Sequence, residues 1–530
     1  MQFYGISITP IINILKQKVQ SVSQVWLADD ATSAGKLNDL KEWWIQIIEE
    51  GRRYGYFVKP SKSWLILKNI EQVEETETLF RDCPINITTA GKRHLGAALG
   101  TDGFKMSYID EKVEEWCKRL TKLTEIARSQ PHAAYTAYTH GEQHRYTYFM
   151  RTISDIADNL KPLDDIINNK FLPTLFGRDL TEEDRELLSL PIKEGGIGIR
   201  TIHDNSVISY RTSRNITDPL IHQIKIQSDV LPKAEVVARA KAVTMQRVRA
   251  AEAEHAEDVK TGQSEEMQRN LTQITEPGAS SWMGALPLSQ YGFDLSKGEF
   301  QDSLCLRYLK PLKNLPPNCV CGQKFSAAHA LHCQNGGFVN ARHDNIRDLE
   351  GSLLKSVCND VQIEPPLQKV TNKTNFKKSA NLSDEARLDV RAKGFWRPGQ
   401  NAFFDVSVTN PDCDSQRGLT VKTVLENHEK RKKRHYNQRV IDVEHGTFTP
   451  LIFTASGAMG HECIKYHKAL AEKISRKKGD KYEDIMRYIR VRISFLVLKA
   501  TLLCLRGSKS LKQQIEVADD FGQTLHELGV

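Results

Sequence analysis

The sequence predicts a multidomain α+β protein, and three observations support this fold class. The chain has 530 residues with 40% apolar content, which is enough to bury more than one hydrophobic core. Helical periodicities alternate with short apolar runs that have the composition of strands. The stretch "TEPGASSWMGALPLSQYG" (275–292) interrupts a long polar helical pattern, and its Pro, Gly and Ser residues indicate a boundary between domains.

The composition argues against several classes of protein. The most apolar run, Ile493–Leu505, is too short to cross a bilayer and contains Lys499, so it predicts a buried core helix. The stretch "MQFYGISITP" has neither the basic region nor the cleavage site of a secretory signal. Ten cysteines are scattered over the chain, which does not favour a disulfide framework. We therefore expect an intracellular protein, nuclear or cytoplasmic and not secreted, with no membrane partner.

The net charge of +8 is modest for this length, but the charges are unevenly distributed. Between Arg417 and Arg439 there are eight Lys or Arg residues against two Glu, with His428 and His435 in addition. Such a run is either a solvated helix face or a patch that follows nucleic-acid phosphates. Clustered cations favour the second role because they displace condensed counterions from nucleic acid.

The first hundred residues combine helices with short strands. Two helical patterns flank the turn "QVWLADDATSAG" (24–35), which carries the adjacent carboxylates Asp29 and Asp30. The run "SWLILK" (63–68) predicts a strand. The glycine-containing stretch "TTAGKRHLGAALGTDG" (88–103) predicts a hairpin.

The stretch "CVCGQKFSAAHALHC" contains a cluster of potential zinc ligands. Cys319 and Cys321 lie on a turn that Gly322 tightens, and a helical turn with His329 and Cys333 follows. Two thiolates on a turn and two further ligands on a helical turn can form a small tetrahedral zinc site. Protein would fill all four positions, so the predicted role of this zinc is structural.

Two histidines compete for the fourth ligand position of this cluster. His329 is four residues before Cys333, so both side chains lie on one helix face. His332 is adjacent to Cys333 and points about 100° away on helical geometry. We therefore predict His329 as the ligand and His332 as a candidate phosphate contact. The alternative for the whole cluster is a set of buried free cysteines with an incidental histidine.

A second candidate site lies in "EARLDVRAKGFWRPGQNAFFDVSVTN" (385–410), which predicts two strands joined by a turn. In the second strand Phe403, Asp405 and Ser407 share one face. A carboxylate inside an apolar strand is costly unless it is paired or bound to a metal. Asp389 lies in the neighbouring strand, and two such carboxylates are the minimum needed to hold Mg²⁺ against a phosphate.

The segment "TVKTVLENHEKRKKRHYNQRV" (420–440) predicts a helix after these strands. Glu426, Lys430 and Lys433 lie at positions i, i+4 and i+7, so they share one face of this helix. That face offers a third carboxylate and cations for the charge that builds on a reacting phosphate. The apolar run "PLIFTAS" (450–456) predicts an interior strand. The alternative is an ordinary α/β domain with a ladder of surface salt bridges.

Taken together, these stretches resemble non-LTR retrotransposon proteins that carry a restriction-like endonuclease, and the resemblance covers most of the chain. The stretch "VWLADDATSAG" is similar to the third catalytic motif of the reverse transcriptase palm, with Leu27 where the family has an aromatic residue. The stretch "GYFVKPSKSWLILK" is similar to the next palm motif, and "RHLGAALG" and "LSLPIKEGGIGI" resemble parts that lead to and end the thumb. Downstream, "CVCGQKFSAAHALHC" and "RHDNI" resemble the family's Cys-Cys-His-Cys element and the motif that follows it.

The resemblance assigns a polymerase role to Asp29, Asp30 and Lys62. It also implies that the family's first metal-binding aspartate and its template-gripping motif precede the Asp-Asp turn. Met1 begins just after those motifs, so the sequence is expected to be an N-terminally truncated member with an inactive polymerase.

The resemblance also assigns a nuclease core of the PD-(D/E)XK type. Asp389 and Asp405 would bind Mg²⁺ or Mn²⁺, although Leu388 replaces the usual proline and Ser407 occupies the position of the usual lysine. The lysine would then come from the helix, where the candidates are Lys430 and Lys433, with Glu426 as a further carboxylate. The expected contacts to nucleic acid are Arg342, His343, Arg431, Lys432, Arg434 and Tyr436.

The predicted organisation follows from these motifs. It comprises a partial palm (1–100), a thumb-like helical region (101–205), a helical linker (206–275), a zinc element (276–341), an α/β restriction-endonuclease-like domain (342–510) and a C-terminal helix (511–530). The expected partners are target DNA and, in the intact family, the element's RNA. The predicted function is nicking of target DNA, which in the family primes reverse transcription. The alternative is a non-catalytic nucleic-acid-binding remnant.

Overall fold

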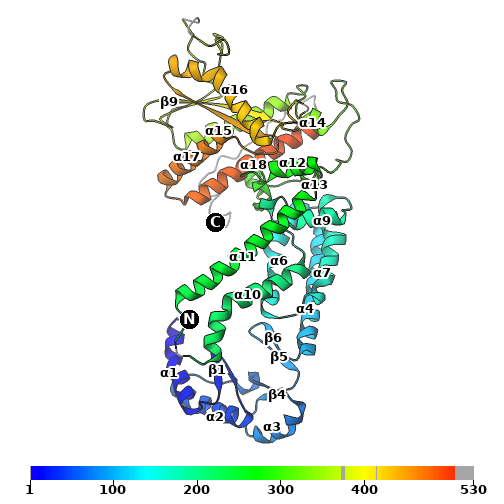
Figure 1. Ribbon diagram of the computed structural model, residues 1–530, viewed down its shortest axis with the longest axis vertical. Coiled ribbons are helices and arrows are strands. Elements are labelled where there is room, and N and C mark those ends of the chain that lie inside the picture. Colours follow the sequence, from blue (N-terminus) through cyan, green and yellow to red (C-terminus); the bar gives the residue numbers. More distant parts are fainter. Residues whose placement is uncertain (1, 229, 372–375, 414, 508–530) are drawn as a thin grey trace. The chain divides into compact units, whose positions relative to one another are not determined.

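The computed structural model describes residues 2–228, 230–371, 376–413 and 415–507 (Figure 1). The predicted C-terminal helix (511–530) lies outside the described residues. Within the described part of the chain, no helix is both long enough and apolar enough to span a bilayer.

The chain forms two compact units, each built from separate segments. Unit 1 comprises Met1–Leu120, Glu142–Ile167 and Thr201–Glu254, and unit 2 comprises Thr121–Gly141, Asn168–Arg200 and His255–Val530. The predicted domain ranges follow the chain in order and do not coincide with these units. Parts of the thumb-like range and of the linker range belong to each unit.

Unit 1 contains three small two-stranded sheets and several helices. Its strands are β1 (Ser23–Leu27), β2 (Asp30–Ala34), β3 (Trp64–Ile66), β4 (Asn86–Thr88), β5 (Gly91–His94) and β6 (Ala97–Gly100). Its helices are α1 (Gln2–Lys18), α2 (Leu37–Arg53), α3 (Val73–Leu79), α6 (Gln143–Thr152), α7 (Lys161–Ile166) and α10 (Ile202–Lys225), while α4 (Asp102–Ala127) and α11 (Ala234–Thr261) contain residues of both units. The antiparallel β5–β6 pair confirms the predicted hairpin.

The turn with the two aspartates joins β1 to β2, which form an antiparallel hairpin. Helices α1 and α2 pack together through a small core that contains Leu15, Trp43 and Ile47. The hairpin is attached to this core because Gln24 Oε1 accepts hydrogen bonds from the indole nitrogens of Trp26 (3.1 Å) and Trp43 (3.2 Å).

Unit 2 is built around a four-stranded sheet with the order β10-β9-β8-β7. Its strands are β7 (Val361–Ile363), β8 (Val390–Lys393), β9 (Asn401–Thr409) and β10 (Thr447–Thr454). Its helices are α5 (Pro131–Ala137), α8 (Leu172–Phe176), α9 (Glu182–Ser189), α12 (Glu265–Ile274), α13 (Lys297–Arg307), α14 (Ala327–Ala330), α15 (Phe338–Lys355), α16 (Val421–Asp442), α17 (His461–Lys478) and α18 (Tyr482–Arg506). Strands β8 and β9 are antiparallel, as expected for two strands joined by the "RPGQ" turn. Strand β10 is parallel to β9 and follows helix α16.

Both faces of this sheet are covered by helices, which explains the continuous burial along β9. On one face, Phe404 and Val406 belong to a large core formed with α15, α17 and α18. On the other face, Phe403 packs with Val440 of α16, and Ile452 of β10 packs with the start of the same helix. Figure 1 shows α16 and α17 on opposite sides of β9. Full burial of one large apolar side chain adds about 1.5–3 kcal/mol to the free energy of unfolding. The buried residues on both faces therefore stabilise the packing of the helices on the sheet.

Candidate functional site

Asp389 and Asp405 lie opposite one another on adjacent antiparallel segments. The register pairs Val390 with Phe404, so the residue before Val390 stands opposite the residue after Phe404. The ladder ends at Val390, and Asp389 is held beside β9 by its amide, which donates to the Phe404 carbonyl oxygen at 3.2 Å. Asp405 lies in a strand, as the sequence predicted, whereas Asp389 directly precedes the neighbouring strand β8.

The carboxylate of Asp405 is buried and faces helix α16. Its side chain is 7% exposed, and Lys432 Nζ lies 2.6 Å from its Oδ2 atom. The two groups therefore form a close ion pair. Burial raises the pKa of the Asp405 carboxyl, with the charge of Asp389 adding to the shift and that of Lys432 opposing it.

The carboxylate of Asp389 is fixed by two donors that approach the same oxygen. The Val406 amide donates to Asp389 Oδ2 at 2.5 Å, and His343 Nε2 lies 3.2 Å from that oxygen. The other ring nitrogen of His343, Nδ1, lies 3.4 Å from Asp344 Oδ1. Burial lowers the pKa of His343, but the contacts with Asp389 and Asp344 outweigh burial, so this pKa lies above its usual value.

The structure places Lys432, and not the two predicted lysines, beside the buried carboxylate. Lys430 pairs with Glu426 on the helix surface at 3.7 Å, and Lys433 pairs with Glu462 at 2.6 Å. Lys432 was expected only as a contact to nucleic acid. Neither Lys430 nor Lys433 can share its direction, because residues one or two positions apart on a helix point about 100° or 200° from each other.

The direction of Lys432 follows the apolar stripe of α16. Val421, Leu425 and Val440 are buried against the sheet, and Tyr436 is half-buried against Phe448 with ring centroids 5.7 Å apart. Lys432 lies four residues before Tyr436 and therefore on the same face. Continuation of this apolar stripe was the sequence signal that could have selected Lys432.

The other predicted contacts to nucleic acid fall into two groups. Arg431 and Arg434 are exposed on α16, as is Lys430, which was predicted as a catalytic lysine, and Arg431 also contacts the ring of His428 at 3.2 Å. Arg342 is only 4% exposed and donates to the Leu331 carbonyl oxygen at 3.2 Å. Its guanidinium therefore supports the backbone beside the cysteine–histidine cluster, and its contact with nucleic acid stays a prediction.

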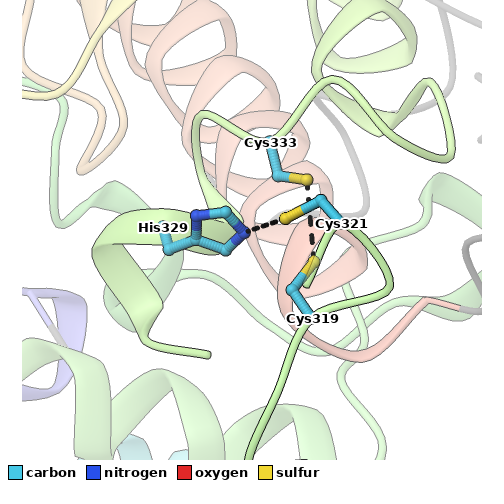
Figure 2. Close-up of side chains that lie close together, drawn as sticks. All are labelled: Cys319, Cys321, His329 and Cys333. Carbon is cyan, nitrogen blue, oxygen red and sulfur yellow. Dashed lines mark hydrogen bonds between the residues drawn. The ribbon is translucent and has the colours of Figure 1, made fainter. Parts of the chain in front are cut away.

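The cysteine–histidine cluster is a compact set of four side chains (Figure 2). Its members are Cys319, Cys321, His329 and Cys333, and their ligand atoms all lie within 4.8 Å of one another. The Sγ atoms of Cys319 and Cys333 are 3.6 Å apart, and Cys321 Sγ lies 3.2 Å from His329 Nε2. Two thiolates on tetrahedral Zn²⁺ would be separated by about 3.8 Å, so the cluster fits this metal.

Local backbone geometry forms this cluster. Gly322 has a φ of 86°, which completes the tight turn between the first two cysteines. Ser326 accepts a hydrogen bond from the His329 amide and so begins the short helix α14. The Cys321 amide is the largest cause that lowers the pKa of Cys319, which is about 6. A lowered pKa favours the thiolate form of Cys319, which is the form that binds metal.

The choice between the two histidines is settled by their contacts. His332 directs Nδ1 to the Ala328 carbonyl oxygen at 2.8 Å, so it lies outside the four-residue cluster. His329 belongs to the cluster, as helical spacing predicted.

The turn with the two aspartates is an exposed hairpin end. Asp29, Asp30 and Lys62 are all exposed, and the Asp29 carbonyl oxygen accepts a hydrogen bond from Tyr56 at 3.0 Å. Among the described residues, the cysteine–histidine cluster is the only group of three or more potential ligand side chains whose ligand atoms all lie within 4.8 Å of one another. Neither this hairpin nor the group of His343, Asp389 and Asp405 is that compact.

A comparison with models of protein families finds no match to the chain, and a comparison with curated proteins finds none either.

Proposed function

We propose that unit 2 is a metal-dependent DNA endonuclease that nicks one strand, in a protein of the non-LTR retrotransposon lineage. One observation carries the proposal. Asp389, which directly precedes β8, contacts β9 on both sides of Asp405, and the ammonium group of Lys432 lies at the Asp405 carboxylate. Two carboxylates and a lysine are the groups that phosphodiester hydrolysis requires for metal binding and for neutralisation of the phosphate.

The residues fit a divalent cation. The buried Asp405 carboxylate is paired with Lys432, but burial and the nearby charge of Asp389 oppose its ionisation and raise its pKa. A cation between the two aspartates would compensate for the burial of this charge. Mg²⁺ or Mn²⁺ bound there would supply Lewis acid stabilisation of the phosphate oxygens.

Lys432 has a direct role in this proposal. An ammonium group has three N–H donors, and contact with Asp405 uses at most one or two of them. A remaining donor can bind an oxygen of the scissile phosphate. Hydrolysis forms a bond between a water oxygen and phosphorus and breaks the bond between phosphorus and O3′. The products are a 5′-phosphate and a 3′-hydroxyl, and the latter is the end that a polymerase extends.

The exposed cations of α16 favour a second candidate function, nucleic-acid binding without catalysis. Lys430, Arg431 and Arg434 are accessible to a phosphate backbone in either case. The two functions differ in their dependence on the carboxylates.

The test is nicking of a supercoiled plasmid in Mg²⁺ by the wild-type chain and by Asp405→Ala. The endonuclease proposal expects Mg²⁺-dependent nicked circles from the wild type, none from the variant, and equal DNA binding by both. The zinc-loaded Glu472→Gln variant is a control, because that carboxylate pairs with Arg476 on the exposed surface of α17. DNA binding without nicking by any of these proteins would support the binding function instead.

A further inference from the structure

His343 contacts one of the two carboxylates, Asp389, and lies on a different element, helix α15. Helix α15 packs against β7, β8 and β9, and it places His343 Nε2 at 3.2 Å from Asp389 Oδ2. The two residues are 46 positions apart in the chain. The side chain of His343 is 34% exposed, so it lies at the edge of the core with access to solvent.

The contact of His343 is not needed to hold the strand. The Asp389 amide is already bonded to the Phe404 carbonyl, and its Oδ2 atom already accepts the Val406 amide. A third interaction at this position cannot improve the strand register. It can only fix the rotation of the carboxylate group, because two donors then converge on one of its oxygens. Both donors reach Oδ2, so Oδ1 would be the oxygen available to a cation.

His343 is itself held in place by a chain of charged groups on α15. Its Nδ1 atom faces Asp344 Oδ1 at 3.4 Å, and Arg347 Nη1 lies 3.0 Å from the same Asp344 oxygen. If His343 had only a packing role, its contact with Asp389 would add little, because backbone hydrogen bonds already hold that aspartate. An imidazole that is fixed on one side and directed at a candidate metal ligand on the other has the arrangement of an outer-shell partner.

We propose that His343 is a positioning residue of the nuclease centre, which orients the Asp389 carboxylate so that one oxygen is directed to the divalent metal. This inference rests on the proposed endonuclease function. It predicts that loss of the imidazole weakens metal binding, while a side chain that keeps an N–H donor at the same place retains it. Outer-shell partners of this kind typically contribute about 10- to 100-fold to metal affinity or activity.

The test measures Mn²⁺ binding to the full-length, zinc-loaded chain by electron paramagnetic resonance, together with the Mg²⁺ dependence of nicking. The Asp389→Asn/Asp405→Asn double variant defines binding elsewhere on the chain. His343→Ala is expected to bind Mn²⁺ about 10- to 100-fold more weakly than the wild type and to need correspondingly more Mg²⁺ for half-maximal nicking. His343→Gln is expected to recover most of this loss, because its amide can donate to Asp389. Thermal unfolding should be the same for both variants.

The outcomes separate this inference from the function on which it rests. If the double variant binds Mn²⁺ as the wild type does and still nicks DNA, the endonuclease proposal fails. If the double variant loses both but His343→Ala equals the wild type, only the role of His343 is overturned. If His343→Gln is as weak as His343→Ala, the imidazole acts in another way, as a direct ligand, and the positioning role is overturned.

Discussion

Arg342 and His343 are consecutive residues of α15 that contact two different sites of unit 2. Arg342 donates to the Leu331 carbonyl oxygen, two residues before Cys333, while His343 contacts Asp389. One turn of a single helix therefore contacts both the backbone beside the cysteine–histidine cluster and the carboxylate of Asp389.

The first prediction concerns Lys432 and its neighbour Lys430. Replacement of Lys432 by alanine should reduce the single-turnover nicking rate roughly 10²-fold or more, the usual cost of removing a group that stabilises a reacting phosphate. Replacement of Lys430 should leave this rate nearly unchanged, because its ammonium pairs with Glu426 on the surface. Rates are measured at saturating DNA so that binding does not contribute. Equal losses in the two variants would show that Lys432 has no special role.

The second prediction concerns the exposed cations of α16. Alanine at Lys430, Arg431 and Arg434 together should weaken DNA binding at low salt. The slope of log affinity against log salt should fall by about one for each phosphate that the variant no longer neutralises. The nicking rate of the bound complex should remain close to that of the wild type. The measurement is a salt titration of duplex binding by fluorescence anisotropy, and an unchanged slope would mean that DNA approaches another surface.

The third prediction concerns zinc. The purified wild-type chain should retain one equivalent of zinc through dialysis, and Cys333→Ser should retain none, because it removes one of the four ligands. Cys413→Ser is the matched control, since that cysteine lies near Ser415 in a loop outside the cluster. Elemental analysis gives the metal content. Zinc that remains bound to Cys333→Ser at full stoichiometry would exclude this cluster as the site.

The fourth prediction is a dependence of stability on pH through His132. This side chain is 2% exposed, and its Nδ1 atom accepts a hydrogen bond from the Leu295 amide at 3.2 Å. Burial lowers its pKa to about 4. The unfolded state therefore binds the proton more readily, so the contribution of His132 to stability is complete above pH 6.5 and is lost progressively as the pH falls towards 4. The full loss is about 3 kcal/mol.

Comparison of His132→Gln with the wild type separates the titration of His132 from acid release of the metal. Urea unfolding is measured at pH 7 and pH 4.5 for the wild type and for His132→Gln, with exposed His332→Gln as the control. The difference in unfolding free energy between the two pH values should be smaller for His132→Gln than for the wild type. An identical pH dependence would show that the pKa of His132 is the same in the folded and unfolded states, which would contradict the shift that burial causes.

The fifth prediction concerns the hairpin with the two aspartates. Asp29 and Asp30 are exposed, and no third ligand side chain joins them at close spacing among the described residues. A polymerase needs carboxylates that hold two metals together, so we expect no primer extension by this chain in Mg²⁺ or Mn²⁺. The assay uses a primed RNA template and labelled deoxynucleotides. Robust incorporation that Asp29→Ala abolishes would contradict the expectation.

Sequence spacing was sufficient where the deciding contacts are local. The separation of His329 and Cys333 by one helical turn selected the correct histidine. Alternation along β9, with a turn before it, placed Asp405 on a strand next to Asp389. Both inferences use only the repeat of a helix or of a strand, which a short stretch of sequence defines.

The features that sequence reasoning missed depend on contacts between distant segments. His343 reaches Asp389 only because α15 packs on the sheet, and no local pattern reports that contact. Lys430 and Lys433 share a face with Glu426, but that spacing does not say which face of α16 meets the sheet. The apolar stripe of α16 identifies the face that meets the sheet, and Lys432 lies in line with that stripe.

The most direct test of the central claim is the chemistry at the nick. Wild-type chain loaded with zinc is incubated with supercoiled plasmid and Mg²⁺, and the nicked product is offered to a DNA polymerase. We predict nicked circles with extendable 3′-hydroxyl ends from the wild type, and none from Asp389→Asn or Asp405→Asn, although all three proteins bind the plasmid. Nicking at the wild-type rate by either variant, or its absence from the wild type under the same conditions, would contradict the proposal that these two carboxylates form a nuclease centre.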